Sequence, residues 1–585
     1  MNRLYKRIAI GVLALLGVAV LALYLISLRA APLINELLRD WATDQVASQS
    51  DSVYALRVGR LHFNGPRRRV TLDSALVVTD SARNAQRSWP KTTVQGVLRN
   101  CVISGVNVPR LVLGRGLEAS QIGCAEVHWE SDAPPDSASV ARFKQASTRA
   151  PRPKPRPADS ARTIEAPHGT MLTFQRDLNL PRRVPTIRIG RIVFPNVAIG
   201  IVARKPSGDR KRFDLARAQL RITGVVIDPA EPQYRTRPLF AEGVVLRADS
   251  TEFHPDTAQM VRVGALEVDL TDSTITVNDF EQGPRISDAD FQRLSPYRRE
   301  RIRFKAARLA IRGIDQGGYS RSGAIMARAI ELDSLRFEIL SDKRKPRRPG
   351  PRVPSRTPQS WFSSLENRVA VDSIHATNAT IIYEEFKTGH DRPGRLTIDD
   401  VDLLALHMRH EPDRRSATDT MSLEIRGKLM SQGTLRLAIT TPLDAERMTM
   451  WVRGSLGAMD AQALNPLIEH VTPARIKNGR IDGVIFEYTV RNDVARGVVV
   501  PRYTDLAADL TGTGAGGILG RRGPLGGLIR AGAEAAQGLK VRQNNPDKPD
   551  QPPRVGQVNY TFKGESLPSW FWNVIKQGLL SVAMK

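Results

Sequence analysis

Few residues of this 585-residue chain are spaced in a way that could perform chemistry. His407 and His410 are the one histidine pair of note, but positions three apart on a β-strand face opposite sides of the sheet, so the two rings would not share a metal. The pattern Gly512-x-Gly514-x-x-Gly517 matches the dinucleotide fingerprint. No parallel βαβ unit is expected around these glycines, so the pattern indicates a flexible Gly-rich loop.

The remaining polar residues do not form a catalytic set. Carboxylates such as Asp399, Asp400 and Asp402 gather near turns, where their expected role is to solvate the turn. We find no Walker A motif, no nucleophile elbow and no constellation for general acid–base or nucleophilic catalysis. We therefore expect a protein that is not an enzyme and that has no metal and no cofactor.

The chain has only two cysteines, Cys101 and Cys124. Two cysteines cannot form a Cys-rich zinc site. In an oxidising compartment they could pair and close a loop, which would stabilise the fold by roughly 3 kcal/mol. The alternative is two buried free thiols, and the sequence leaves the choice open.

The formal net charge of +26 indicates anionic partners. Lipid headgroups, lipopolysaccharide and nucleic acid are the candidates. The basic residues are spread along the chain without a nucleic-acid-binding motif, and aromatics for base stacking make up only 6% of residues. We therefore expect no nucleic-acid partner.

The elements that must carry these residues are mostly strands. The octet Ile-Arg-Ile-Gly-Arg-Ile-Val-Phe at 187–194 recurs in similar form at 56–63 and 261–268, in shortened form at 554–560, and with Asp in place of Gly at 330–337 and 369–376. Alternation of period two predicts a strand with one buried face, and the Gly or Asp marks a bulge or bend. The inward positions are expected to include Ile187, Ile189, Val261 and Val263.

The N-terminus predicts a membrane anchor. Residues 8–28 carry no charge and reach about 30 Å as a helix, the thickness of a bilayer core. Arg3, Lys6 and Arg7 precede them, which places the N-terminus in the cytoplasm and the bulk of the chain outside. A cleaved signal peptide is the rival interpretation. Residues 32–46 then predict a short amphipathic helix.

Two basic, Pro-rich tracts divide the rest of the chain into predicted β regions. Residues 132–166 and 343–360 are basic and Pro-rich, which predicts extended linkers or solvated insertions that could also touch anionic headgroups. Strands are expected throughout the other regions, one of them at 110–113. The predicted parts are a cytoplasmic tail (1–7), the anchor (8–28), an N-terminal β region (29–131), the first linker (132–166), a middle β region (167–342), the second insertion (343–360), a C-terminal β region (361–510), a Gly/Ala-rich segment and loop (511–553), and a last strand with a helix (554–585).

Helical patterns are scarce. One runs over 460–471, with Asp460 as N-cap and Pro466 as a point where it could kink or split. Another spans 569–584, where Trp570, Phe571, Val574 and Ile575 share a broad apolar face. That face could pack on the sheet, lie on a membrane or bind a partner.

The order of parts resembles that of AsmA-like proteins, which are related to the larger TamB-like proteins. An anchor, a short amphipathic segment and the strand at 56–63 resemble the start of that family. The later part resembles the family's C-terminal region through the motifs Met450-Trp451-Val452-Arg453-Gly454-Ser455-Leu456-Gly457, Leu464-Asn465-Pro466-Leu467, Gly479-Arg480-Ile481-Asp482-Gly483, Gly497-Val498-Val499-Val500-Pro501-Arg502-Tyr503-Thr504-Asp505-Leu506, Gln543-Asn544-Asn545-Pro546, Arg554-Val555-Gly556, Trp570-Phe571-Trp572 and Gly578-Leu579.

The resemblance implies a single-pass protein of the bacterial inner membrane whose periplasmic part is an elongated, curled antiparallel β-sheet with few helices. It also implies that an apolar groove along this sheet binds or conveys phospholipids or lipopolysaccharide-type lipids between the inner and outer membranes, in outer membrane biogenesis. The alternative is a structural adaptor that binds an envelope protein through its C-terminal helix.

Overall fold

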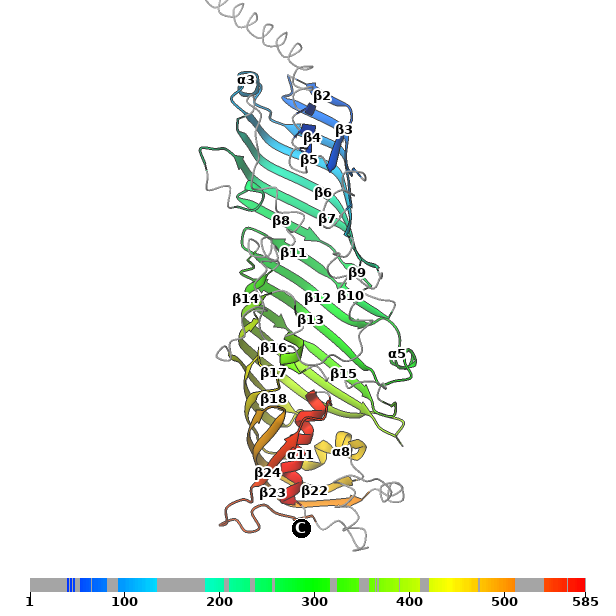
Figure 1. Cartoon of the computed structure of the whole chain (residues 1–585), viewed down its shortest axis with the longest axis vertical. Helices are drawn as coiled ribbons and strands as arrows, with labels where there is room; N and C mark the ends of the chain where they lie inside the picture. Colours follow the sequence, from blue (N-terminus) through cyan, green and yellow to red (C-terminus); the bar gives the residue numbers. More distant parts are fainter. Residues whose placement is uncertain are drawn as a thin grey trace, which may run out of the picture. The chain divides into compact units, whose positions relative to one another are not determined.

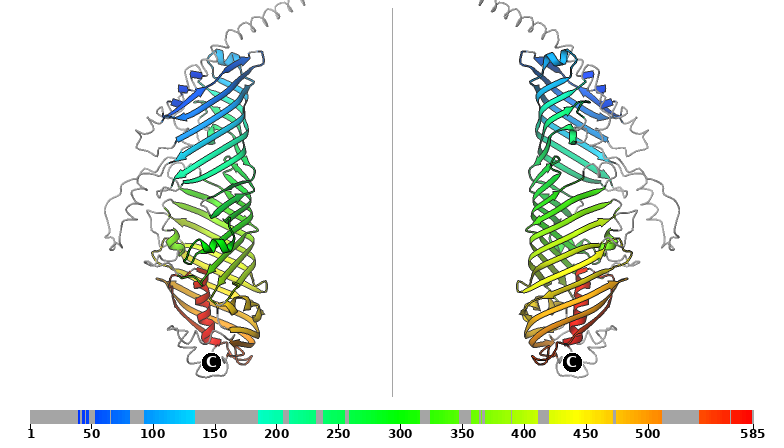
Figure 2. Two further views of the ribbon diagram at one scale, coloured as in Figure 1. Left: turned by 90° about the vertical axis from the view of Figure 1, so that its right-hand side faces the viewer. Right: turned by 90° about the vertical axis from the view of Figure 1, so that its left-hand side faces the viewer.

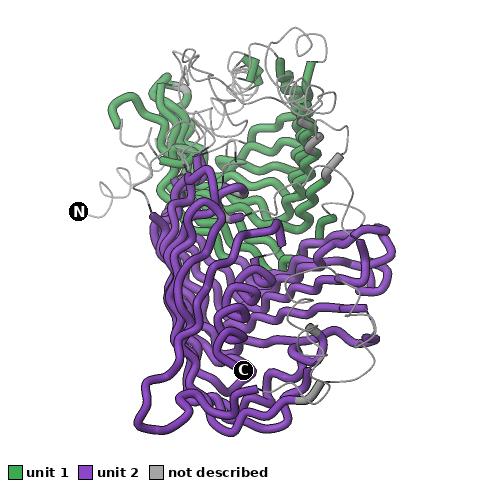
Figure 3. The backbone as a smooth tube through the Cα atoms, turned by 60° about the horizontal axis from the view of Figure 1, so that its bottom comes forward, with its two compact units in different colours: residues 1–256, 263–276, 319–323 green, residues 257–262, 277–318, 324–585 purple. Residues whose placement is uncertain are grey.

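The computed structural model describes residues 39–40, 43–44, 46–47, 53–64, 66–80, 93–133, 185–204, 210–231, 237–254, 258–315, 324–346, 357–362, 365, 368–388, 390–410, 420–471, 474–510, 541–565 and 567–583. Strands dominate this part of the chain (Figure 1). The predicted tail and anchor at 1–28 lie outside it. Among the described helices, none is long and apolar enough to span a bilayer. The chain divides into two compact units (Figure 3).

Unit 1 comprises residues 1–256, 263–276 and 319–323. β1 and β2 both pair with β3, the strands β3 to β8 pair in chain order, and β8 also pairs with β11. All of these pairs are antiparallel except β5 with β6, which is parallel. The elements are β1 (Tyr54–Val58), β2 (Leu61–Asn64), β3 (Arg69–Thr79), β4 (Thr93–Ser104), α3 (Val108–Val112), β5 (Leu117–Ala133), β6 (Ile187–Arg204), β7 (Arg210–Ile227), η3 (Pro238–Phe240), β8 (Gly243–Ala248), β9 (Thr251–Phe253) and β11 (Ala265–Asp269).

The strand expected at 110–113 is wrong, because residues 110–112 belong to helix α3 and Leu113 is its C-cap. Asn107 caps the helix by accepting a hydrogen bond from the backbone N–H of Arg110, and Pro109 lies in its first turn. Both residues are helix-start signals. Leu111 is buried in the core of unit 1 beside Val106 and Leu117. Packing on the sheet therefore stabilises a helix too short to persist alone.

Unit 2 comprises residues 257–262, 277–318 and 324–585. Its sheet curls, and helix α11 lies against the curled face (Figure 2). The elements with most of their residues in this unit are β10 (Gln259–Val263), β12 (Thr274–Pro284), α5 (Asp288–Arg293), β13 (Glu300–Arg312), β14 (Ile325–Asp333), β15 (Arg336–Asp342), α7 (Pro358–Phe362), β16 (Val369–Phe386), β17 (Gly394–His410), β18 (Thr420–Leu429), β19 (Gly433–Pro442), β20 (Met450–Leu456), β21 (Met459–Asp460), η4 (Ala461–Leu464), α8 (Asn465–Val471), β22 (Ala474–Arg491), β23 (Val494–Leu510), β24 (Gly556–Thr561) and α11 (Leu567–Ala583).

The mainly β, curled fold with few helices is as expected, but the strands are not all antiparallel. β5 pairs parallel with β6, and β16 pairs parallel with both β14 and β15. Parallel neighbours need a connection of a dozen residues or more, because the chain must return to the end from which it started. Residues 134–186 and 343–368 make these two connections, and they contain nearly all of the two basic Pro-rich tracts.

Two bulges interrupt the pairing of β16 with β17. Asn378 and Asp400 have positive φ, and the β16–β17 register shifts at both; Ser334, between β14 and β15, also has positive φ. An extra residue moves every later side chain to the other face of a sheet. At Ser334 the register does not shift, because β13 pairs Arg308 with Asp333 before it and Lys305 with Arg336 after it. Ser334 therefore marks the break between β14 and β15 without adding a residue against its neighbours.

The Gly or Asp of the recurring octets coincides with a break in the strand in some copies and not in others. Gly59 separates β1 from β2, Gly264 separates β10 from β11, and the octet at 330–337 contains the bend at Ser334 between β14 and β15. Gly190 lies inside β6 at a point without a register shift, so there the expected bulge is wrong. Asp372 likewise lies inside regular pairing of β16, and Gly556 begins β24.

Helix α11 completes the core of unit 2 and agrees closely with the predicted helix. Trp570 and Val574 are buried against β20, β22, β23 and β24, with Phe571 and Ile575 packed beside them. Gly578 faces Val499 so closely that an added Cβ would lie 2.5 Å from a methyl carbon. The helix expected at 460–471 forms as η4 and α8, divided between Leu464 and Asn465, just before Pro466, and capped by Asp460.

Candidate functional site

The face of the unit 2 sheet that carries α11, here called the α11 face, is apolar for several strands beyond the helix. Cross-strand pairing aligns Ile302, Ile339 and Tyr383 in one row, and the Tyr383 hydroxyl lies 3.0 Å from Ser569 Oγ of α11. The next row holds Phe304, Phe337 and Ile381. Branched and aromatic residues at alternate positions form such a face directly.

Aromatic rings extend this face towards β12. Phe280 meets Phe304 edge-to-face with ring centroids 5.6 Å apart, and Phe304 meets Phe337 at 6.5 Å. All three rings are only half-buried, and Ile302 is 43% exposed. The same face is fully packed under α11, where Val452 and Tyr488 are 2% exposed. Beyond the helix, the face therefore presents apolar surface that no described element covers completely.

A polar row borders the apolar rows where α11 begins. Glu300, Ser341 and Glu385 pair across β13, β15 and β16. Glu385 is 4% exposed, accepts a 2.5 Å hydrogen bond from the Tyr383 hydroxyl and forms an ion pair with Lys343. Burial and the neighbouring carboxylate raise the pKa of Tyr383, so its hydroxyl stays protonated and acts as a donor. Lys343 Nζ also donates to Ser569 Oγ at 3.3 Å.

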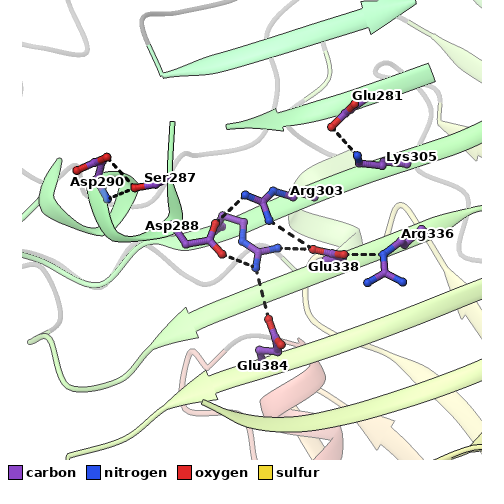
Figure 4. Close-up of polar contacts among 10 residues, drawn as sticks. Glu281, Ser287, Asp288, Asp290, Arg303, Lys305, Arg336, Glu338 and Glu384 are labelled. Carbon is purple, nitrogen blue, oxygen red and sulfur yellow. Dashed lines mark hydrogen bonds and ion pairs between the residues drawn. The ribbon is translucent and has the colours of Figure 1, made fainter. Parts of the chain in front are cut away.

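The opposite face of the same strands carries a cluster of charged side chains that includes Asp288, Arg303 and Glu338 (Figure 4). Arg301 is at its centre. Arg301 is 2% exposed and donates to Glu338 at 2.8 Å, to Asp288 at 3.1 Å and to Glu384 at 3.4 Å. Arg303 reaches the same Asp288 at 2.9 Å. The cluster thus ties β13, β15, β16 and α5 together, because its carboxylates come from three of these elements.

Ion pairs favour the charged forms of the carboxylates in this cluster and of Asp342, farther along β15. Burial by itself would raise the pKa of Glu338, but Arg336 and Arg301 outweigh burial and hold the pKa below its ordinary value. Asp342 behaves in the same way, since Arg344 overcomes its burial and lowers its pKa. Arg344 also stacks on the Phe386 ring, 4.1 Å from its centroid. The arrangement is that of a structural ion-pair network and offers no free nucleophile.

The expected inward positions occupy different environments. Ile187 and Ile189 are 3% and 8% exposed in the core of unit 1, where α3 and η3 pack on the sheet. Val263 is 8% exposed, and Val261 is half-buried on β10. Ile187 and Ile189 therefore fill a core. The more open apolar surface is that of Phe280, Phe304 and Phe337, of which only Phe337 lies in one of the octets.

The cysteines lie directly opposite each other on β4 and β5, and the structure joins Cys101 to Cys124 in a disulfide. His410 is 4% exposed, with ring nitrogens 2.9 Å from Asp444 and 3.2 Å from the Leu365 carbonyl. His407 has positive φ within β17. Residues 512–517, with the Gly-rich pattern, lie outside the described residues.

No described group of three or more His, Cys, Asp and Glu side chains is arranged to hold a metal ion. Trp570, Phe571, Val574 and Ile575 of the C-terminal helix contact the sheet of their own unit. Comparisons of the chain with models of known protein families and with curated proteins find no match.

Proposed function

We propose that this chain binds the acyl chains of lipids on the α11 face of unit 2. The observation that supports the proposal is the half-exposed apolar surface of Ile302, Phe280, Phe304 and Phe337, which continues from the packed core under α11. Monomeric proteins rarely expose continuous apolar surface without a use for it. A lipid tail would gain about 0.8 kcal/mol for each CH₂ group removed from water.

We further propose that the protein is anchored in the inner membrane by residues 8–28 and acts in envelope biogenesis, as the resemblance to AsmA-like proteins implies. The disulfide between Cys101 and Cys124 supports a location in an oxidising compartment. Labelling of a cysteine introduced into the tail or the sheet with a membrane-impermeant reagent tests the orientation. A tail that is labelled in intact spheroplasts would contradict it.

The lipid proposal is tested by mass spectrometry of lipids that co-purify with the full chain in a mild nonionic detergent. Ile302→Arg places a charge on the α11 face at a position exposed enough to tolerate it, and we expect at least a tenfold loss of bound lipid. Ile485→Arg is the matched control, because Ile485 is 63% exposed and its neighbour Phe486 faces α11. Equal lipid content in both folded variants would refute acyl-chain binding at this face.

An adaptor role for the C-terminal helix is not favoured by the same geometry. Trp570 is 1% and Val574 0% exposed, so the broad apolar face is already used within unit 2. A partner could reach these side chains only after the helix left the sheet.

A further inference from the structure

The turn between β2 and β3 and the tip of helix α3 form one basic surface of unit 1, here called the α3 end. It comprises Arg67, Arg68, Arg69, Leu113 and Arg115. α3 and β2 lie at the same end of the unit (Figure 1). The Arg68 carbonyl accepts a hydrogen bond from the Val106 N–H at 3.0 Å, and Arg68 Nε donates to the Val106 carbonyl at 3.0 Å. α3 begins two residues after Val106, and its five residues span about 8 Å, so the turn and the helix tip are neighbours.

The arginines of the α3 end carry charge that no described carboxylate neutralises. Arg67, Arg68 and Arg69 are consecutive and exposed, and Arg115 is exposed as well. Among the described residues, no carboxylate oxygen lies within 4.0 Å of the side-chain nitrogens of these four arginines. The carboxylates on neighbouring segments are paired with other arginines: Glu118 with Arg110, and Asp228 and Glu231 with Arg188. The α3 end therefore has an excess of positive charge.

Leu113 adds an apolar side chain to this basic surface. It is 65% exposed, more than any other large apolar side chain among the described residues. The helix holds it in place, because Leu111 is buried in the core of unit 1 and the Gly114 N–H donates to the Leu111 carbonyl at 3.1 Å. A single exposed leucine is ordinary on a protein surface. A leucine flanked by unpaired arginines is typical of a surface that lies on a membrane.

We propose that the α3 end docks on the surface of a bilayer that contains anionic lipids. Guanidinium groups bind lipid phosphates through paired hydrogen bonds, and Leu113 enters the boundary between headgroups and acyl chains. The arginines select this partner over an uncharged bilayer, because basic clusters are attracted to anionic headgroups. The inference goes beyond the proposed function, since the α3 end belongs to unit 1 and contacts a membrane surface, whereas the α11 face of unit 2 binds acyl chains.

The test places a fluorescent label on the full chain and adds vesicles. The two cysteines of the chain are joined in a disulfide, so Leu113→Cys supplies a single free thiol. A nitrobenzoxadiazole label on that thiol reports whether position 113 leaves water. We expect its emission to shift to the blue and to rise about twofold or more with vesicles of phosphatidylcholine mixed equally with phosphatidylglycerol. With vesicles of phosphatidylcholine alone, the emission should not change.

Ile201→Cys is the matched control for the label. Ile201 is also an exposed apolar residue of unit 1, at 42%, but it lies near the last residue of β6. The first residue of β6, Ile187, is the one that pairs with Leu117 beside α3. A label at position 201 should therefore stay in water with both kinds of vesicle. An anchor at residues 8–28 would be present in both labelled chains, so it cannot produce a difference between them.

A charge variant of the labelled chain tests the arginines. Arg67→Gln, Arg69→Gln and Arg115→Gln together should abolish the response at position 113. Arg68 is left unchanged, because its side chain holds the loop before α3. Thermal melts show whether the variant is folded, and substitutions at these exposed positions should leave the melting temperature unchanged.

The control for charge neutralises three exposed arginines of unit 2. Arg426→Gln, Arg475→Gln and Arg480→Gln change side chains that are 71%, 63% and 69% exposed. Both triple variants have the same net charge, so the comparison separates the α3 end from the general attraction of a basic chain.

Loss of the response in the first triple variant alone supports docking by the α3 end. An equal loss in both triple variants overturns the proposal, as does an equal response with phosphatidylcholine alone or no response with either kind of vesicle. The Ile302→Arg variant keeps this proposal distinct from the proposed function. It should lose co-purified lipid and keep the response at position 113, so either proposal can fail while the other stands.

Discussion

Arg301 shows at the scale of one residue how unit 2 holds charge inside a β fold. Its guanidinium is 2% exposed and is surrounded by three carboxylates. Arg301→Ala leaves those carboxylates without their partner, and breaking a buried pair costs about 3–5 kcal/mol. We expect a loss of that size in the free energy of unfolding, measured by urea titration.

Arg426→Ala provides the comparison, since Arg426 is 71% exposed and pairs with Glu424 at 3.9 Å. Exposed pairs contribute roughly 0–1 kcal/mol. An equal loss in the free energy of unfolding for both variants would show that the ion pairs of Arg301 stabilise unit 2 no more than an exposed pair does.

Glu338 predicts how this cluster responds to acid. Its pKa in the folded protein lies below the ordinary value of 4.5. The ion pairs therefore contribute fully at pH above 4.5, and their contribution is lost as the pH falls through the folded-state pKa. Glu338→Gln should lower stability at pH 7 and make it less dependent on pH below 4.5. Urea titrations at pH 7 and pH 3 test this, and an unchanged slope would contradict it.

The fit of α11 against the sheet is the main feature at the scale of elements. Gly578 lies against Val499 and Val558, and the Cβ of any other residue would come within 2.5 Å of Val499. Gly578→Val should therefore push the helix away and cost about 1–3 kcal/mol or more, in the range of an overpacked core. The measurement is the thermal midpoint of the full chain.

Asn573→Val is the control for β-branching in the same helix, because Asn573 is only half-buried. Equal midpoints for the two valine variants would show that the helix does not pack as described.

The sequence predicts individual strands and helices better than it predicts how they pair or pack. Residues 300–312 are expected as a strand and form β13, because alternation and flanking turns both mark it. The parallel pairs do not follow from the sequence, since pairing depends on the path of connections that alternation does not describe. Alternation also predicts that Ile189 lies on the buried face of its strand. It does not predict that α3, which is far away in the chain, packs on that face. Nothing in the sequence marks Arg301 as buried.

The whole chain carries a net charge of +26, so two kinds of lipid contact should be separable. Headgroup attraction is screened by salt, because the Debye length falls from about 10 Å at 0.1 M to about 3 Å at 1 M. Burial of acyl chains is not weakened in this way. We expect binding to anionic vesicles, measured by sedimentation, to disappear at 1 M NaCl while co-purified lipid stays bound. Neutral vesicles are the control, and loss of both kinds of lipid in salt would contradict acyl-chain binding.

The bulges at Asn378 and Asp400 fix which side chains of β16 and β17 face each side of the sheet. A residue deleted at either bulge would exchange the two faces along the rest of that strand. A substitution alters one side chain, whereas this deletion inverts half a strand. Such strands should accept many replacements yet reject changes in length, so their lengths should be kept far more strictly than their residues.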